Sequence, residues 1–141
     1  MSDTNSAKDS ITFLYVEDDE LSRQIMQTLL QRVMGYTKVY LFRDSDHFRE
    51  RLHALPTKPT VMFLDIHMQP VNGFELLQTI RADDSYQDTI VIAVTASVMN
   101  EEMTRLQHSG FDGAVSKPLS LETFPTLVPR ILNGESVWYV A

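Results

Sequence analysis

Short hydrophobic runs alternate along the chain with longer stretches in which hydrophobic residues recur every three or four positions. The runs are rich in β-branched and aromatic residues and do not alternate with polar ones, which is typical of strands covered on both faces of a parallel sheet. The longer stretches have the period of amphipathic helices. Strands are predicted at 11–16, 37–42, 61–64, 89–94 and 111–116, and helices at 20–33, 44–55, 74–80, 99–109 and 121–132.

Two of the helices carry boundary signals. The helix at 44–55 is expected to begin at a cap formed by Asp44 or Ser45 and to end before Pro56, because a residue that precedes proline disfavours the helical conformation. The last helix contains Pro125 and Pro129. A proline in a helix interior removes a backbone hydrogen bond and costs about 3 kcal/mol. A kinked or short final helix is therefore expected.

Five successive strand–helix repeats predict a doubly wound α/β fold, in which helices cover both faces of a parallel sheet. One domain is expected at 11–132, between a flexible N-terminal tail at 1–10 and a C-terminal tail at 133–141. The C-terminal tail is apolar, so it either folds back on the domain or pairs with another chain. In such sheets the ligand site lies beyond the carboxyl ends of the strands.

Composition and charge narrow the classes of function. The 141 residues are 43% hydrophobic and 22% charged, which is ordinary for a globular domain. The net charge of −7 argues against binding to nucleic acid or to anionic lipid. The absence of cysteine excludes disulfides, thiolate metal sites and cysteine nucleophiles. Because the sequence has neither a signal peptide nor an apolar run of about 18 residues, we expect a soluble cytoplasmic protein with no membrane partner.

Polar residues follow the predicted strands at the edge of the sheet where their carboxyl ends meet. They are Glu17-Asp18-Asp19 after the first strand, Asp65 after the third, Thr95 after the fourth and Lys117-Pro118 after the fifth. Carboxylates gathered within a few ångströms raise each other's pKa unless a cation lies among them. Oxygen ligands alone favour Mg²⁺. The sequence therefore predicts a Mg²⁺ site at this edge.

An aspartate, a divalent cation, a hydroxyl and an ammonium group together suit phosphoryl transfer. Asp65 is the candidate nucleophile, because its carboxylate can attack phosphorus to form an acyl phosphate without a general base. Asp19 is expected to hold the metal, with Asp18 bound partly through water. Lys117 and Thr95 are expected to bind phosphoryl oxygens.

His67 lies two residues after Asp65, and its backbone carbonyl is expected to complete the metal shell. Its side chain is interpreted as that of an exposed loop histidine. The four histidines are scattered and lack the spacing of a zinc site.

These residues and their spacing resemble the receiver domains of bacterial two-component systems. Asp19 precedes Asp65 by 46 positions, Thr95 follows Asp65 by 30, and Lys117 follows Thr95 by 22. The segments Asn72-Gly73-Phe74-Glu75 and Lys117-Pro118 are also similar to the family's pattern, and the resemblance covers 11–132. It implies a flavodoxin-like (βα)5 fold with strand order 2-1-3-4-5, and a cis peptide at Lys117–Pro118.

The resemblance also implies a phosphorelay switch that is not an enzyme toward outside substrates. A histidine kinase or a phosphotransfer protein would donate a phosphoryl group to Asp65 in a Mg²⁺-dependent reaction, and slow self-hydrolysis would remove it. A conformational change would carry the signal onward. The sequence leaves no room for an output domain after Leu132, so output is expected through a downstream protein, through a homodimer or through a relay.

The chain departs from the family pattern at two places. The family usually has an aromatic residue three positions before the lysine, whose ring moves inward with the threonine, but Ala114 stands there. A proline is usual four residues after the phosphoacceptor, but Gln69 stands there and Pro70 follows. The aromatic half of the switch and the turn after Asp65 are therefore expected to differ.

Three other functions stay open at this point. A nucleotide- or flavin-binding module needs a Gly- or Ser/Thr-rich loop after the first strand, where this chain has an acidic run that repels phosphate. A phosphatase with an aspartate nucleophile would want a second acid where His67 stands. A degenerate receiver that serves only as a scaffold is supported by Ala114 alone. Any single strand-end Asp or Thr is more often a helix cap, but that reading weakens when all of them lie in register.

Overall fold

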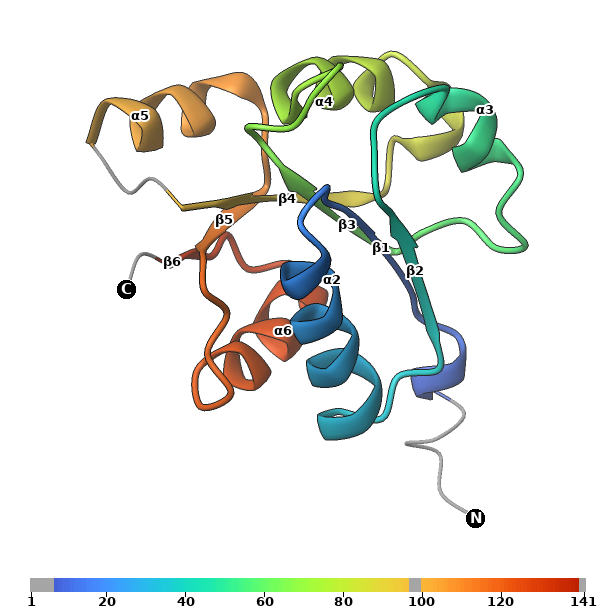
Figure 1. The fold of residues 1–141 in the computed structure, drawn as a ribbon, viewed down its shortest axis with the longest axis vertical. Helices are drawn as coiled ribbons and strands as arrows, with labels where there is room; N and C mark the ends of the chain where they lie inside the picture. Colours follow the sequence, from blue (N-terminus) through green and yellow to red (C-terminus); the bar gives the residue numbers. More distant parts are fainter. Residues whose placement is uncertain (1–6, 97–99, 140–141) are drawn as a thin grey trace.

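A computed structural model describes residues 7–96 and 100–139, in which six parallel strands form one sheet (Figure 1). The strands lie in the order β2-β1-β3-β4-β5-β6. They are β1 (Thr12–Val16), β2 (Lys38–Phe42), β3 (Val61–Asp65), β4 (Ile90–Thr95), β5 (Gly113–Ser116) and β6 (Trp138–Tyr139). The predicted order of the first five strands is confirmed. The two-residue strand β6 extends the sheet beyond β5.

Helices cover both faces of the sheet, as the strand–helix alternation predicted (Figure 1). One face carries α3 (Phe48–His53), α4 (Gly73–Arg81) and α5 (Asn100–Ser109), and a short turn, η2 (Asp84–Tyr86), precedes β4. The other face carries α6 (Phe124–Leu132) and α2 (Glu20–Gln27) with its π-helical continuation η1 (Thr28–Val33). No helix in the described ranges is both long enough and apolar enough to span a bilayer.

The buried strands explain why the sheet has a core on each side. In β1, Leu14 and Val16 pack among the residues of the α3–α4–α5 face, whereas Phe13 and Tyr15 pack on the α2–α6 face. Successive side chains of a strand point to opposite faces, so an uninterrupted hydrophobic run fills both cores. This arrangement holds the carboxyl ends of β1, β3, β4 and β5 at one edge.

Two helices, α3 and α6, begin later than the sequence predicted. Helix α3 follows His47, which has a φ of 48°, and no side chain caps its first turn. The Ser45 hydroxyl instead accepts a hydrogen bond from the Val71 amide at 2.8 Å. Asp44 pairs with Arg51 at 2.7 Å. Both predicted caps are therefore wrong, because these side chains hold the turn and the neighbouring loop rather than the helix end.

The final helix begins at Phe124 and runs through both prolines. Pro125 lies in the first turn, where a backbone donor would have no helical partner. Pro129 lies inside the helix. The apolar residues Phe124, Leu127, Val128 and Ile131 pack on the α2–α6 face.

Segments near both ends of the chain contact the domain. Val137 is 2% exposed, and its carbonyl accepts a hydrogen bond from the Ala114 amide at 2.8 Å. The C-terminal segment thus folds back on the domain, which was one of the two alternatives. At the other end, the Lys8 ammonium donates to the Met34 carbonyl. Residues 7–10 thus include a contact with the domain, and the first six residues of the predicted tail lie outside the described ranges.

Candidate metal centre

Three acidic side chains and one lysine meet at the carboxyl edge of the sheet. Asp65 is the last residue of β3, Glu17 and Asp18 follow β1, and Lys117 follows β5. One carboxylate oxygen from each of Glu17, Asp18 and Asp65 lies within 4.8 Å of the other two. The Lys117 ammonium lies 3.6 Å from Asp65 Oδ2. Asp18, Asp65 and Lys117 are thus brought together as the strand ends predicted.

Glu17 lies at the centre of this cluster, although the sequence pattern predicted no specific role for it. It is 0% exposed. Its Oε1 accepts hydrogen bonds from the Tyr15 hydroxyl at 2.6 Å and from Lys117 Nζ at 2.7 Å. Its Oε2 accepts one from the Asp19 amide at 3.1 Å. A buried carboxylate requires such partners. The sequence did contain one sign of this contact. Glu17 lies two residues after Tyr15, and residues two apart in a strand point to the same face.

Asp19 lies outside the three-carboxylate cluster, in contrast to the metal-ligand role expected for it. Its Oδ2 accepts hydrogen bonds from the Ser22 amide at 2.8 Å and from the Ser22 hydroxyl at 2.7 Å. These bonds cap the N-terminus of α2 and lower the pKa of the Asp19 carboxyl. In this arrangement Glu17 and Asp18 are the acidic pair that faces Asp65, one position earlier than expected.

The charges of the cluster are out of balance. Burial and the neighbouring Glu17 raise the pKa of Asp65 to about 6. Burial also acts to raise the pKa of Glu17, but hydrogen bonds with Asp65, Lys117 and Tyr15 outweigh it and lower that pKa. The proton belongs on Asp65 because Lys117 lies closer to Glu17, at 2.7 Å against 3.6 Å. Above the pKa of Asp65, one ammonium faces three ionised carboxylates, an arrangement that a divalent cation would neutralise.

In the presence of a chelator, the contribution of Asp65 to the stability of the protein is expected to fall as pH rises from about 4 to about 6. An unfolded aspartate loses its proton near pH 3.8, whereas folded Asp65 keeps it to about 6. The folded state therefore holds an extra proton in this window and loses that advantage as pH rises through the folded pKa. Thermal unfolding across the window measures the effect. Asp65→Asn should flatten this part of the profile, and identical profiles for the two proteins would contradict the assignment.

Thr95 closes the site from β4. It is 1% exposed and lies beside Ser116 in the β4–β5 register. Its carbonyl accepts a hydrogen bond from the Lys117 amide at 2.8 Å. This hydrogen bond joins the ends of β4 and β5. Thr95 and Lys117, which were predicted to act together, are therefore neighbours at the edge of the sheet.

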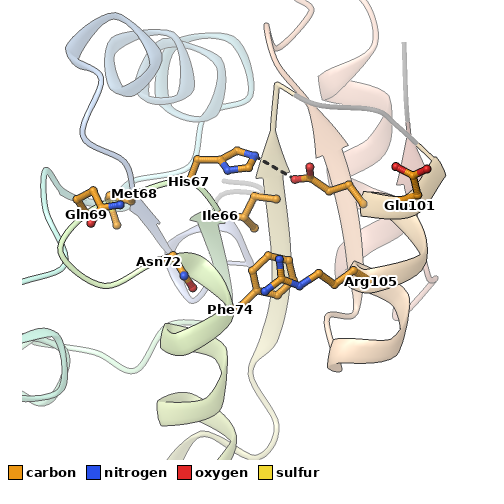
Figure 2. A pocket seen from close by; sticks show the side chains of 9 residues that line it. Ile66, His67, Met68, Gln69, Asn72, Phe74, Glu101 and Arg105 are labelled. Atoms are coloured by element: carbon orange, nitrogen blue, oxygen red, sulfur yellow. Dashed lines mark ion pairs between the residues drawn. The ribbon is translucent and has the colours of Figure 1, made fainter.

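The loop after Asp65 brings His67 back to the site. The His67 amide donates to Asp65 Oδ1 at 3.1 Å. Its ring extends toward α5, where Nε2 lies 3.0 Å from Glu102 Oε1 (Figure 2). The side chain thus has a partner although it lies on an exposed loop. The expected role of the His67 carbonyl as a metal ligand stays a prediction.

Gly73 lets the first turn of α4 approach the end of β3. A Cβ at this position would lie 2.8 Å from Ile66 Cα and 2.9 Å from the Asp65 carbonyl oxygen. Beside it, Asn72 caps α4 by accepting a hydrogen bond from the Glu75 amide at 3.0 Å. The resemblance of this segment to the receiver pattern thus has a steric basis.

Gly73→Ala is expected to lower the free energy of unfolding by about 1–3 kcal/mol, because the added methyl group forces backbone apart. Alanine normally stabilises a helix relative to glycine, so a loss would identify the close contact. Chemical denaturation measures the effect. Gln78→Ala, on the exposed side of α4, is the control and should change stability by no more than about 0.5 kcal/mol. Unchanged stability in Gly73→Ala would contradict the close approach.

Both departures from the receiver pattern have a structural outcome. Ala114 of β5 pairs in register with Trp138 of β6, and both pack with the core on the α3–α4–α5 face. An aromatic ring on this face therefore comes from the next strand. In the loop after Asp65, the Gln69–Pro70 peptide is cis. The Lys117–Pro118 peptide is also cis, as the resemblance implied.

The chain is similar to a known family over most of its length. A family model described as the response regulator receiver domain matches residues 13–128. The polar-differentiation response regulator DivK of Brucella anthropi is 30% identical over 124 residues, which cover 85% of this chain and 94% of that protein. Stress response regulator protein 1 of Candida dubliniensis is 28% identical over 109 residues, and the match spans only 38% of that longer protein.

Solved structures show the same fold at lower sequence identity. The chemotaxis response regulator CheY4 of Vibrio cholerae has a TM-score of 0.75 and 24% identity, over 86% of this chain and 98% of that one. The signal receiver domain of a DNA-binding response regulator from Colwellia psychrerythraea 34H has a TM-score of 0.76 and 22% identity, over 87% and 98% of the two chains. These likenesses support the flavodoxin-like fold.

Proposed function

The chain belongs to the response regulator receiver domains of two-component signalling, and from this premise we propose that it is a phosphorylation switch whose phosphoacceptor is Asp65. The observation that carries the proposal is the position of the Asp65 carboxylate. It lies within 4.8 Å of two other carboxylates and 3.6 Å from the Lys117 ammonium. An acid in this setting lies beside a cation and beside two carboxylates that could share a metal ion with it.

In the proposed reaction, an oxygen of Asp65 attacks the phosphorus of a phosphohistidine and forms the new P–O bond. The P–N bond breaks, and its electron pair leaves with the imidazole. Lys117 pairs with a phosphoryl oxygen as a mobile cation, and the Thr95 hydroxyl donates a hydrogen bond to another. Hydrolysis of the acyl phosphate returns the Asp65 carboxylate and inorganic phosphate. The chain would thus act chemically only on itself.

Glu17, Asp18 and Asp65 fit Mg²⁺, because they offer only oxygen ligands and carry more negative charge than Lys117 balances. Bound there, Mg²⁺ would supply positive charge against the phosphoryl oxygens. Glu17 would orient Lys117 as well as face the metal, since its Oε1 already accepts the ammonium at 2.7 Å. The raised pKa of Asp18, which comes from desolvation and from Glu17, is consistent with a carboxylate short of positive partners.

Receiver domains work with histidine kinases and with downstream targets. We propose that a kinase or a phosphotransfer protein supplies the phosphoryl group here and that output passes to a protein partner. The acidic composition, with a net charge of −7, disfavours direct output through nucleic acid.

Incubation with acetyl phosphate and Mg²⁺, followed by intact-mass measurement, tests the proposal. The protein is expected to gain one phosphoryl group, and a chelator should prevent the gain. A phosphatase with outside substrates is the alternative to exclude, so p-nitrophenyl phosphate should not be turned over. No gain of mass with acetyl phosphate, or multiple turnover of the ester, would overturn the proposed switch.

A further inference from the structure

One acidic side chain of α5 contacts two residues of the phosphoacceptor site. The Thr95 hydroxyl donates a hydrogen bond to Glu102 Oε1 at 3.3 Å. The same oxygen lies 3.0 Å from His67 Nε2 (Figure 2). The Glu102 side chain is 19% exposed and Thr95 is 1% exposed, so the contact is largely shielded from water. Glu102 comes from neither a strand end nor a metal-binding pattern, and the proposed reaction does not use it.

We propose that Glu102 is a positioning residue for Thr95 and restrains its hydroxyl until Asp65 carries a phosphoryl group. This inference rests on the proposed function. A hydroxyl has one proton to donate, and in the unphosphorylated protein Thr95 directs that proton toward α5. A phosphoryl group on Asp65 presents anionic oxygens that compete for it. Thr95 must therefore weaken its bond to Glu102 before it can stabilise the phosphoryl group.

The charge of Glu102 acts in the same direction. Its carboxylate adds negative charge beside the position that the phosphoryl oxygens would occupy, in a site where burial weakens screening. The geometry therefore makes Glu102 an opponent of phosphorylation, in contrast to Lys117. Removal of the Glu102 side chain should therefore free the Thr95 hydroxyl to turn toward the phosphoryl group. It should also remove the repulsion between Glu102 and the phosphoryl oxygens.

The change of partner also affects how α5 is held. Glu102 and Arg105 line a groove of about 390 Å³ between α5 and the segment that joins β3 to α4. At the other side of this groove, the Arg105 guanidinium stacks on the ring of Phe74 in α4 (Figure 2). The guanidinium carbon lies 3.8 Å from the centre of that ring. When Thr95 leaves Glu102, the contact between α5 and the site weakens while the stack remains. The phosphorylation state of Asp65 is thus transmitted to one wall of the groove.

The initial rate of phosphorylation by acetyl phosphate with Mg²⁺ tests the inference in the full chain. Glu102→Ala is expected to be phosphorylated about tenfold faster than the parent protein, the equivalent of one charge-assisted hydrogen bond. Glu102→Gln, which keeps an acceptor but removes the charge, should show a smaller increase. Glu101→Ala removes an exposed acid that lines the same groove, and it should stay within about twofold of the parent.

The NMR signal of the Thr95 methyl group provides a readout that a purely structural role would not move. Without donor, Glu102→Ala should shift this signal toward its position in the phosphorylated parent, and Glu101→Ala should not. Equal rates in all variants together with an unmoved signal would overturn the role of Glu102 while leaving the switch intact. A parent protein that gains no phosphoryl group would overturn both.

Discussion

Asp65→Asn is expected to abolish phosphorylation by acetyl phosphate and at the same time to stabilise the protein in the presence of a chelator. The asparagine lacks the nucleophilic carboxylate, so the intact mass should not change. Folded Asp65 has a pKa of about 6, which means that burial and Glu17 disfavour its charged form. A neutral side chain of similar shape should therefore raise the free energy of unfolding by about 1–3 kcal/mol at neutral pH.

The control for this prediction is Asp88→Asn, at an exposed position between η2 and β4. It should be phosphorylated as fully as the parent and should change stability by no more than about 0.5 kcal/mol. Phosphorylation of Asp65→Asn to the parent's level would show that another residue is the phosphoacceptor. A loss of stability in Asp65→Asn would contradict the electrostatic account of the cluster.

Lys117→Met is expected to have the second large effect, this time against stability. Glu17 is 0% exposed and bonds to Lys117 at 2.7 Å. Removal of one partner from a buried pair leaves an uncompensated charge and costs about 3–5 kcal/mol. Denaturation in chelator should show this loss, and Mg²⁺ should restore part of it. Phosphorylation should slow by a factor of about 100 or more, because a phosphoryl oxygen loses its positive partner.

The double variant Lys117→Met with Glu17→Gln separates the two consequences. Without the buried negative charge, the methionine no longer leaves an unpaired ion, so most of the stability should return. Phosphorylation should stay slow because the ammonium is still absent. If the double variant is as unstable as the sum of the two single changes, the Lys117–Glu17 pair does not account for the loss.

The sheet and its functional edge could be predicted because they depend on local pattern. Continuous hydrophobic runs such as 90–94 must be covered on both faces, and parallel strands then place their last residues at a common edge. Asp65 and Thr95 are the last residues of β3 and β4, and Lys117 follows β5, so the structure brings all three to that edge. For these residues, position at a strand end was sufficient.

The choice among adjacent acids could not be made in the same way. Glu17, Asp18 and Asp19 are consecutive, and only the point at which β1 gives way to α2 decides which of them face the site. The Ser22 amide and hydroxyl draw Asp19 into a helix cap, while Tyr15 and Lys117 hold Glu17 inward. These are side-chain contacts that hydrophobic periodicity does not report.

The contribution of the C-terminal segment was hidden for a different reason. A two-residue strand such as Trp138–Tyr139 is too short to show a period. Its place beside β5 depends on Val137, which is buried, and on its carbonyl bond to Ala114. The ring of Trp138 packs on the same face as the small side chain of Ala114. This packing could not be predicted without knowing that the two strands are paired.

The dependence of phosphorylation on Mg²⁺ concentration tests most directly whether Glu17, Asp18 and Asp65 hold the metal that serves Asp65. The initial rate with acetyl phosphate would be measured across a Mg²⁺ titration for the parent, Glu17→Gln and Asp19→Asn. We predict that the half-saturating Mg²⁺ concentration rises at least about tenfold in Glu17→Gln and stays within about twofold in Asp19→Asn. The reverse order of the two variants, or phosphorylation that proceeds equally well in chelator, would contradict this metal centre.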